Sequence, residues 1–110
     1  MKQKTIFDLF PAMRNLRRLV ADMTLDDGVD RETQVTEMSL QLTADVEAMG
    51  ITVRRAWLIF DAYETPKILS RIETLDSNLR GSLQFSEWQD EALIAMESER
   101  GNLCRQIGLL

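Results

Sequence analysis

Apolar residues recur every three or four positions along much of this chain, the spacing that places side chains on one face of an α-helix. The first series has this spacing at six positions: Ile6, Leu9, Met13, Leu16, Val20 and Met23. It is the heptad spacing of helices that pack side by side. Thr5 and Asp8 have the pattern of a helix start, and Pro11 predicts either a kink or a helix that begins near it.

A second series predicts a helix over residues 31–49. Its buried stripe is expected to consist of Val35, Met38, Leu42, Val46 and Met49. Leu40, Ala44 and Ala48 are expected to widen this apolar side. Gly50 follows as a typical helix-ending glycine, because glycine adopts the left-handed backbone conformation without a steric penalty.

The most apolar part of the chain lies at residues 53–60, and we expect the rest of the fold to be arranged around it. Trp57 and Phe60 follow helical spacing, whereas Leu58 and Ile59 add apolar surface at the flanks. A short apolar run could also be a buried strand, but no second strand-like segment exists to pair with it. We therefore predict a buried helix that Thr52 caps and that ends near residue 64.

Thr65 and Pro66 have the pattern of a new helix start, because proline is favoured in the first turn. Residues 66–75 are therefore predicted to form a new or sharply kinked helical segment. Its buried side is expected to consist of Ile68, Leu69, Ile72 and Leu75.

Residues 76–85 have the weakest helical pattern in the chain and are predicted to be a connection. Ser86 then opens an S-x-x-Q capping box, which predicts the start of a last helix. The apolar side of this helix is expected to include Trp88, Ala92, Leu93, Ala95 and Met96. Gly101 is expected to break or fray it, since glycine weakens a helix interior.

These elements predict an all-α fold, a compact antiparallel four-helix bundle-like domain with a kinked third element. The chain has 110 residues, so we expect one helical domain over residues 1–110. One cysteine, Cys104, cannot form an internal disulfide, which favours a reducing compartment. No apolar run approaches the roughly 20 residues that a membrane helix needs. We therefore expect a cytoplasmic protein without a membrane partner.

The composition excludes several kinds of catalytic and metal site. There is no histidine, which excludes histidine-dependent nucleophilic triads and histidine-ligated metals. The lone Cys104 cannot make a CxxC site, and neither a dinucleotide-binding nor a P-loop glycine pattern occurs. We predict no catalytic residues, no cofactor and no metal site, and we expect that the protein is not an enzyme.

Charge is distributed unevenly, although the net charge is −5. Arg14, Arg17 and Arg18 give the first helix a basic face, because residues three and four apart are neighbours on a helix. This face could be solvated and paired with acids of a neighbouring helix, or it could be a docking patch for an acidic partner. The acidic total disfavours nucleic acid as a partner.

The end of the chain is too apolar for a solvated tail. Leu103, Ile107 and Leu110 are expected either to close the core or to form an exposed patch for a second chain. With the heptad spacing of the first helix, this favours a homodimer. By elimination, we predict a non-catalytic protein–protein interaction module, an adaptor, regulator or inhibitor. Its predicted partner-binding residues are the three arginines of the basic face and these three C-terminal residues.

An alternative interpretation is a DNA-binding regulator. Residues 42–60 resemble a helix-turn-helix, with Arg54 and Arg55 at the start of a recognition helix, where base and phosphate contacts are made. Asp45 stands where this motif has an apolar residue, and the run at residues 57–60 is expected to be buried rather than exposed in a groove. We therefore rank it second.

A third interpretation is a degenerate calcium-binding module. Residues 76–87 resemble an EF-hand loop, with Asp76 at its position 1, Asn78 at 3, Gly81 at 6 and Glu87 at 12. The resemblance implies a loop that wraps around a calcium ion. However, Arg80 occupies position 5, where an oxygen ligand is required, and no partner loop is present.

Overall fold

The computed structural model describes residues 4–23, 29–85 and 90–108, and every regular element in these residues is a helix. The helices are α1 (Ile6–Met23), α2 (Val29–Ala48), α3 (Val53–Phe85) and α4 (Asp90–Gln106). The prediction of an all-α fold with four helices is confirmed, and residues 53–60 are helical, not a strand.

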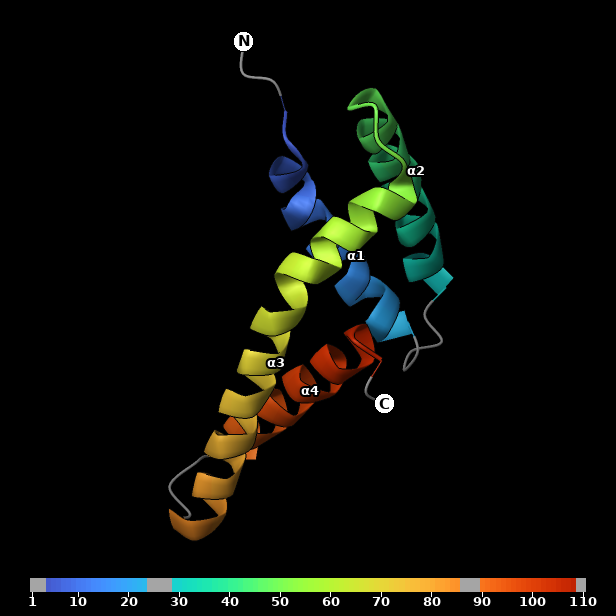
Figure 1. The fold of residues 1–110 in the computed structure, drawn as a ribbon. Coiled ribbons are helices and arrows are strands. Elements are labelled where there is room, and N and C mark those ends of the chain that lie inside the picture. Colours follow the sequence, from blue (N-terminus) through green and yellow to red (C-terminus); the bar gives the residue numbers. More distant parts are fainter. Residues whose placement is uncertain (1–3, 24–28, 86–89, 109–110) are drawn as a thin grey trace. The chain divides into compact units, whose positions relative to one another are not determined.

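The chain divides into two compact units, and the division falls within α3. The N-terminal unit comprises Met1–Tyr63 and the C-terminal unit comprises Glu64–Leu110. In the N-terminal unit α1 and α2 run in opposite directions, and in the C-terminal unit the second part of α3 and α4 do so (Figure 1). That residues 1–110 form a single domain stays a prediction.

The core of the N-terminal unit is formed by α1, α2 and the first part of α3. Its buried side chains are Leu9, Phe10, Met13, Leu16, Leu42, Val46, Ala56 and Phe60. Met13 and Phe60 are at most 1% exposed, and burying a side chain as large as phenylalanine contributes about 1.5–3 kcal/mol. The predicted stripes of the first two helices are thus largely confirmed. An exception is Val20, which is 47% exposed.

The three helix ends that the sequence defined most clearly have the expected local geometry. The carboxylate of Asp8 accepts a hydrogen bond of 2.8 Å from the backbone N–H of Thr5, which is the side-chain half of a capping box. The Thr52 hydroxyl accepts a bond of 3.1 Å from the backbone N–H of Arg55. Gly50, between α2 and α3, has a φ of +79°, as expected for a helix-ending glycine.

Helix α1 begins at Ile6 and continues through Pro11, so the alternative of a helix beginning near Pro11 is wrong. Proline lacks the N–H that would bond to the carbonyl four residues earlier. Leu9, Phe10 and Met13 are buried on both sides of it in the sequence, and this packing offsets the missing bond.

The prediction of a connection at residues 76–85 is wrong, because α3 continues to Phe85. Ile68, Ile72 and Leu75 lie on the buried side of the helix, as predicted, whereas Leu69 is 47% exposed. The side chain of Asp76 is held by Arg100 of α4. Packing and this ion pair therefore outweigh the weak helix preference of Asp76, Asn78 and Gly81. The predicted helix end near residue 64 and the alternative of a new helix from Pro66 are wrong, because α3 runs through both positions, whereas the alternative of a kink at Pro66 stays a prediction.

The C-terminal unit pairs the second part of α3 with α4. Its core consists of Ile68, Ile72 and Cys104, with Leu103 and Ile107 packed against them. At the surface, Arg71 donates two hydrogen bonds to the Glu99 carboxylate, at 2.6 and 3.1 Å. This two-pronged geometry is the strongest that arginine and carboxylate can form.

The predicted break at Gly101 is wrong, because α4 continues to Gln106. Leu103 and Cys104 lie two and three residues after it and pack on α3, so their burial stabilises the helix across the glycine. Gly108, with a φ of +74°, follows the helix instead. The predicted capping box at Ser86 and the predicted apolar residue Trp88 lie outside the described residues.

Substitution of Gly81 tests whether residues 76–85 are helical, and substitution of Gly50 provides a contrast at a glycine with positive φ. In a helix, Gly81→Ala should raise the free energy of unfolding by about 0.5–1 kcal/mol, since alanine has the higher helix propensity and a Cβ there meets no atom within 4 Å. Gly50→Ala should lower it by about 1–2 kcal/mol, because an L residue is strained at positive φ. Urea denaturation measures both. Destabilisation by Gly81→Ala would contradict a helix at this position.

The Arg71–Glu99 pair predicts an acid-dependent loss of stability in the C-terminal unit. The hydrogen bond from Arg71 lowers the pKa of Glu99 below its usual value of 4.5. The stabilisation of the folded state by this pair is therefore complete above pH 4.5 and is lost as the pH falls through the lowered pKa of Glu99. Glu99→Gln should flatten the pH dependence of the melting temperature below this pH. An unchanged pH profile in this variant would show that the pair does not contribute.

Candidate functional site

An exposed stripe of mixed character runs along α1. Phe7, Pro11, Arg14 and Arg18 are spaced by four, three and four positions, so they lie on one side of the helix. All four are exposed, and the Phe7 side chain is 56% exposed. Arg18 also donates a hydrogen bond of 2.8 Å to the side chain of Asn15.

At the N-terminal end of this stripe, three aromatic rings from α1 and α3 are in mutual contact. The ring centroids of Phe7 and Tyr63 are 5.6 Å apart, and each lies 5.1–5.2 Å from that of Phe10. Phe10 is buried, whereas Tyr63 is 45% exposed. The buried ring therefore holds two exposed rings in place. We define Phe7, Pro11, Arg14, Arg18 and Tyr63 as the aromatic–arginine surface.

The third arginine of the predicted basic face, Arg17, is part of the N-terminal unit's own packing. Its guanidinium lies 2.5 Å from a carboxylate oxygen of Asp61. Its Cζ lies 4.7 Å from the ring centroid of Trp57 and 5.5 Å from that of Phe60. Arg17 thus pairs with an acid of a neighbouring helix, which is one of the two interpretations of the basic face.

Most of the apolar residues that favoured self-association pack against other residues of the same chain. In the heptad series of α1, Leu9, Met13 and Leu16 are buried in the core of the N-terminal unit. Leu103 and Ile107 pack in the core of the C-terminal unit, and Leu110 lies outside the described residues. A dimer would therefore need other surfaces.

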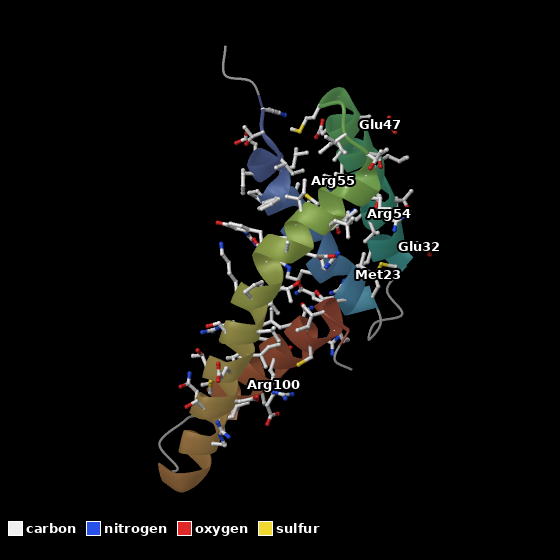
Figure 2. All side chains as sticks on the ribbon, in the orientation of Figure 1. Met23, Glu32, Glu47, Arg54, Arg55 and Arg100 are labelled. Atoms are coloured by element: carbon white, nitrogen blue, oxygen red, sulfur yellow. The ribbon has the colours of Figure 1, made fainter. Side chains whose placement is uncertain are left out.

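The segment that resembles a helix-turn-helix has part of the expected geometry. Helix α2 ends at Ala48, a turn follows, and α3 begins at Val53. Arg54 and Arg55 are exposed on the first turn of α3 (Figure 2). Leu58 is 55% exposed, so the expected burial of this part of the run is wrong.

The segment that resembles an EF-hand lacks the loop that a calcium site requires. Residues 76–85 belong to α3, where ligands cannot wrap around an ion, and Glu87 lies outside the described residues. Among the residues that the structure describes, no three His, Cys, Asp or Glu side chains are placed to hold one metal ion.

The exposed aromatic pair was not predicted from the sequence. Phe7 is not among the six positions of the heptad series, and Tyr63 belongs to no stripe or capping pattern predicted from the sequence. The helical position of Phe7 could have identified it, because Phe7 lies four and seven residues before Pro11 and Arg14, on the polar side of the heptad series. That Tyr63 contacts this side depends on how α3 packs against α1, which no local pattern specifies.

No protein-family model, curated protein or solved structure matches this chain. Within residues 4–23, 29–85 and 90–108, no helix combines the length and the apolar character needed to cross a membrane.

Substitution of Arg17 tests whether this side chain is structural. Arg17→Met retains the apolar stem but removes both the ion pair and the charge near Trp57. We expect the free energy of unfolding to fall by about 1–2 kcal/mol, since a cation–π contact contributes about 0.5–2 kcal/mol and a partly exposed ion pair about 0.2–1 kcal/mol. Urea denaturation measures the change.

Arg80→Met is the matched control, because Arg80 is exposed and such surface changes usually stay within about 0.5 kcal/mol. Asp61→Asn removes the ion pair alone and should cost less than Arg17→Met. Equal effects of Arg17→Met and Arg80→Met would contradict the structural role.

Proposed function

We propose that this protein is a non-catalytic interaction module that binds an acidic segment of another polypeptide through the aromatic–arginine surface. The observation that carries the proposal is the contact between the rings of Phe7 and Tyr63, which remain 56% and 45% exposed. Two large rings held at the surface next to arginines have the composition of an interaction site.

The chemistry of the partner follows from that of the surface. Aromatic and arginine side chains dominate the binding energy of many protein interfaces, because rings supply area at a small entropic cost and guanidinium groups bind carboxylates in a fork geometry. Phe7 and Tyr63 would contact an apolar anchor, and Arg14 and Arg18 would bind flanking carboxylates. The preferred ligand is therefore a short segment that combines Asp or Glu with an apolar side chain.

The proposal also includes self-association as a homodimer in the cytoplasm, and roles as an adaptor, regulator or inhibitor. The support for self-association is the number of large apolar side chains that the structure leaves at the surface. They are Phe7, Val20, Leu40, Leu58, Tyr63, Leu69 and Ile94, each at least 45% exposed.

DNA binding is a second candidate, and the exposure of Arg54 and Arg55 at the start of α3 favours it. A recognition helix presents its first residues to the bases and phosphates. The net charge of −5 opposes attraction to a polyanion, so we rank this function second. It would require binding of duplex DNA that weakens steeply with salt and is lost in the variant Arg54→Glu/Arg55→Glu.

Selection from a displayed library of short random peptides tests the first function with the full chain. The wild-type protein should enrich peptides that carry Asp or Glu beside a large apolar residue. Arg14→Glu/Arg18→Glu should abolish this acidic preference, because the charge that selects carboxylates is reversed. Phe7→Ser should remove the preference for an apolar anchor.

Arg80→Glu provides a matched control, since Arg80 is an exposed arginine of the C-terminal unit outside the aromatic–arginine surface. It should leave the selected sequences unchanged. Selection without any sequence preference, or a preference that survives both Arg14→Glu/Arg18→Glu and Phe7→Ser, would refute binding at this surface.

A further inference from the structure

Helix α2 has a second apolar stripe that faces away from the core. Leu40, Ala44 and Ala48 are spaced by four positions and are all exposed, with Leu40 at 67%. They were expected to widen the buried side of the helix, and that expectation is wrong. Exposed acids, Glu37 and Glu47, lie on the same outward side of α2.

The first part of α3 has an outward side of opposite charge. Arg54 and Arg55 are exposed there, followed by Leu58, which is 55% exposed, and by Ala62, which is also exposed. Both sides belong to the N-terminal unit. In Figure 2, Glu47 lies near the end of α2, and Arg54 and Arg55 lie near the start of α3.

We infer that the outward side of α2 binds the outward side of α3 from a second copy of this chain, with the two helices antiparallel. Going back along α2, Glu47, Ala44 and Leu40 are separated by three and then four positions. Going forward along α3, Arg55, Leu58 and Ala62 are separated by the same three and four positions. One register therefore places Glu47 opposite Arg55, Ala44 opposite Leu58, and Leu40 opposite Ala62.

This register is complementary in shape as well as in charge. Each leucine faces an alanine, so large and small side chains alternate across the interface, as they do where helices pack closely. The same register places Ala48 opposite Arg54, where the small side chain leaves room for the arginine stem to cover apolar surface. Glu47 and Arg55 form no ion pair within the described residues, so each remains available for this contact.

A twofold symmetric dimer forms this contact twice. In an isologous interface, if α2 of one copy binds α3 of the other, the reverse contact forms by symmetry. The inferred dimer therefore requires the outward sides of α2 and α3 to be parts of one continuous face of the N-terminal unit, so that both are covered and the assembly closes at two chains. A single α2–α3 contact that did not close would instead produce open chains of copies.

This inference rests on the proposed self-association and names its surface, but it does not depend on the binding of an acidic partner by α1. The aromatic–arginine surface contributes no residue to it. The two proposals can therefore fail separately.

Charge exchange between the two helices tests the interface with the full chain. Sedimentation equilibrium should show a dimer for the wild type. Glu47→Arg and Arg55→Glu should each weaken dimerisation by about tenfold or more, because like charges then face each other twice in the dimer. The variant with both substitutions should restore dimerisation to within about threefold of the wild type, since the pair is re-formed with reversed polarity.

A steric variant tests the same register without changing charge. Ala44→Trp should abolish the dimer, because alanine faces Leu58 at the closest approach of the helices. Ala95→Trp is the matched control at an exposed alanine of α4 and should leave the dimer intact. Circular dichroism should show an unchanged helix content in every variant, which separates loss of the interface from loss of the fold.

The outcomes distinguish failure of the interface from failure of self-association. A wild-type monomer at all concentrations would overturn self-association and this interface together, whereas peptide selection by the aromatic–arginine surface would still stand. A dimer that tolerates Ala44→Trp and both charge reversals would overturn the interface alone. The interface would also be overturned if Arg55→Glu abolished the binding of duplex DNA but left the dimer intact. That result would assign this side of α3 to DNA.

Discussion

The contact between Phe10 of α1 and Phe60 of α3 is the interaction on which the N-terminal unit depends. The two buried rings meet edge to face, with centroids 5.3 Å apart, a geometry that contributes beyond the area it buries. Phe60 also meets Trp57 and lies beneath the guanidinium of Arg17, and Phe10 supports the exposed rings of the surface. The hydrophobic core and the proposed binding surface are therefore two sides of one aromatic cluster.

Much of the fold could be predicted because helical periodicity is a local property of the sequence. The buried stripes of the first two helices, the cap at Thr52 and the ending at Gly50 all depend on residues within a few positions of one another. The connection predicted at residues 76–85 and the break at Gly101 were wrong for a common reason. Both segments have weak helix formers, and both are stabilised by contacts between α3 and α4 that lie far apart in the sequence, such as Arg100 with Asp76.

The candidate site could be predicted only in part, because charge is easier to interpret from a sequence than exposure. Arg14 and Arg18 lie on the solvent side of α1 as the basic face requires, whereas Arg17, one position from Arg18, turns towards α3. Leu40 and Leu58 are of the same residue type as many core positions. Whether such a leucine is buried or exposed depends on where the neighbouring helices pack. Binding to a partner stays a prediction for every one of these residues.

The position of Pro66 has a consequence for how this chain can be divided. The proline cannot donate to the carbonyl of Ala62, so the backbone ladder of α3 is already interrupted next to the boundary between Tyr63 and Glu64. A fragment that starts just before Thr65 would retain a threonine–proline pair suited to open a free helix. A fragment that stops at Tyr63 would instead end in exposed carbonyl groups without a terminating glycine. A cut before Thr65 therefore provides the second half with a helix start, whereas a cut after Tyr63 leaves the last helix of the first half without a cap.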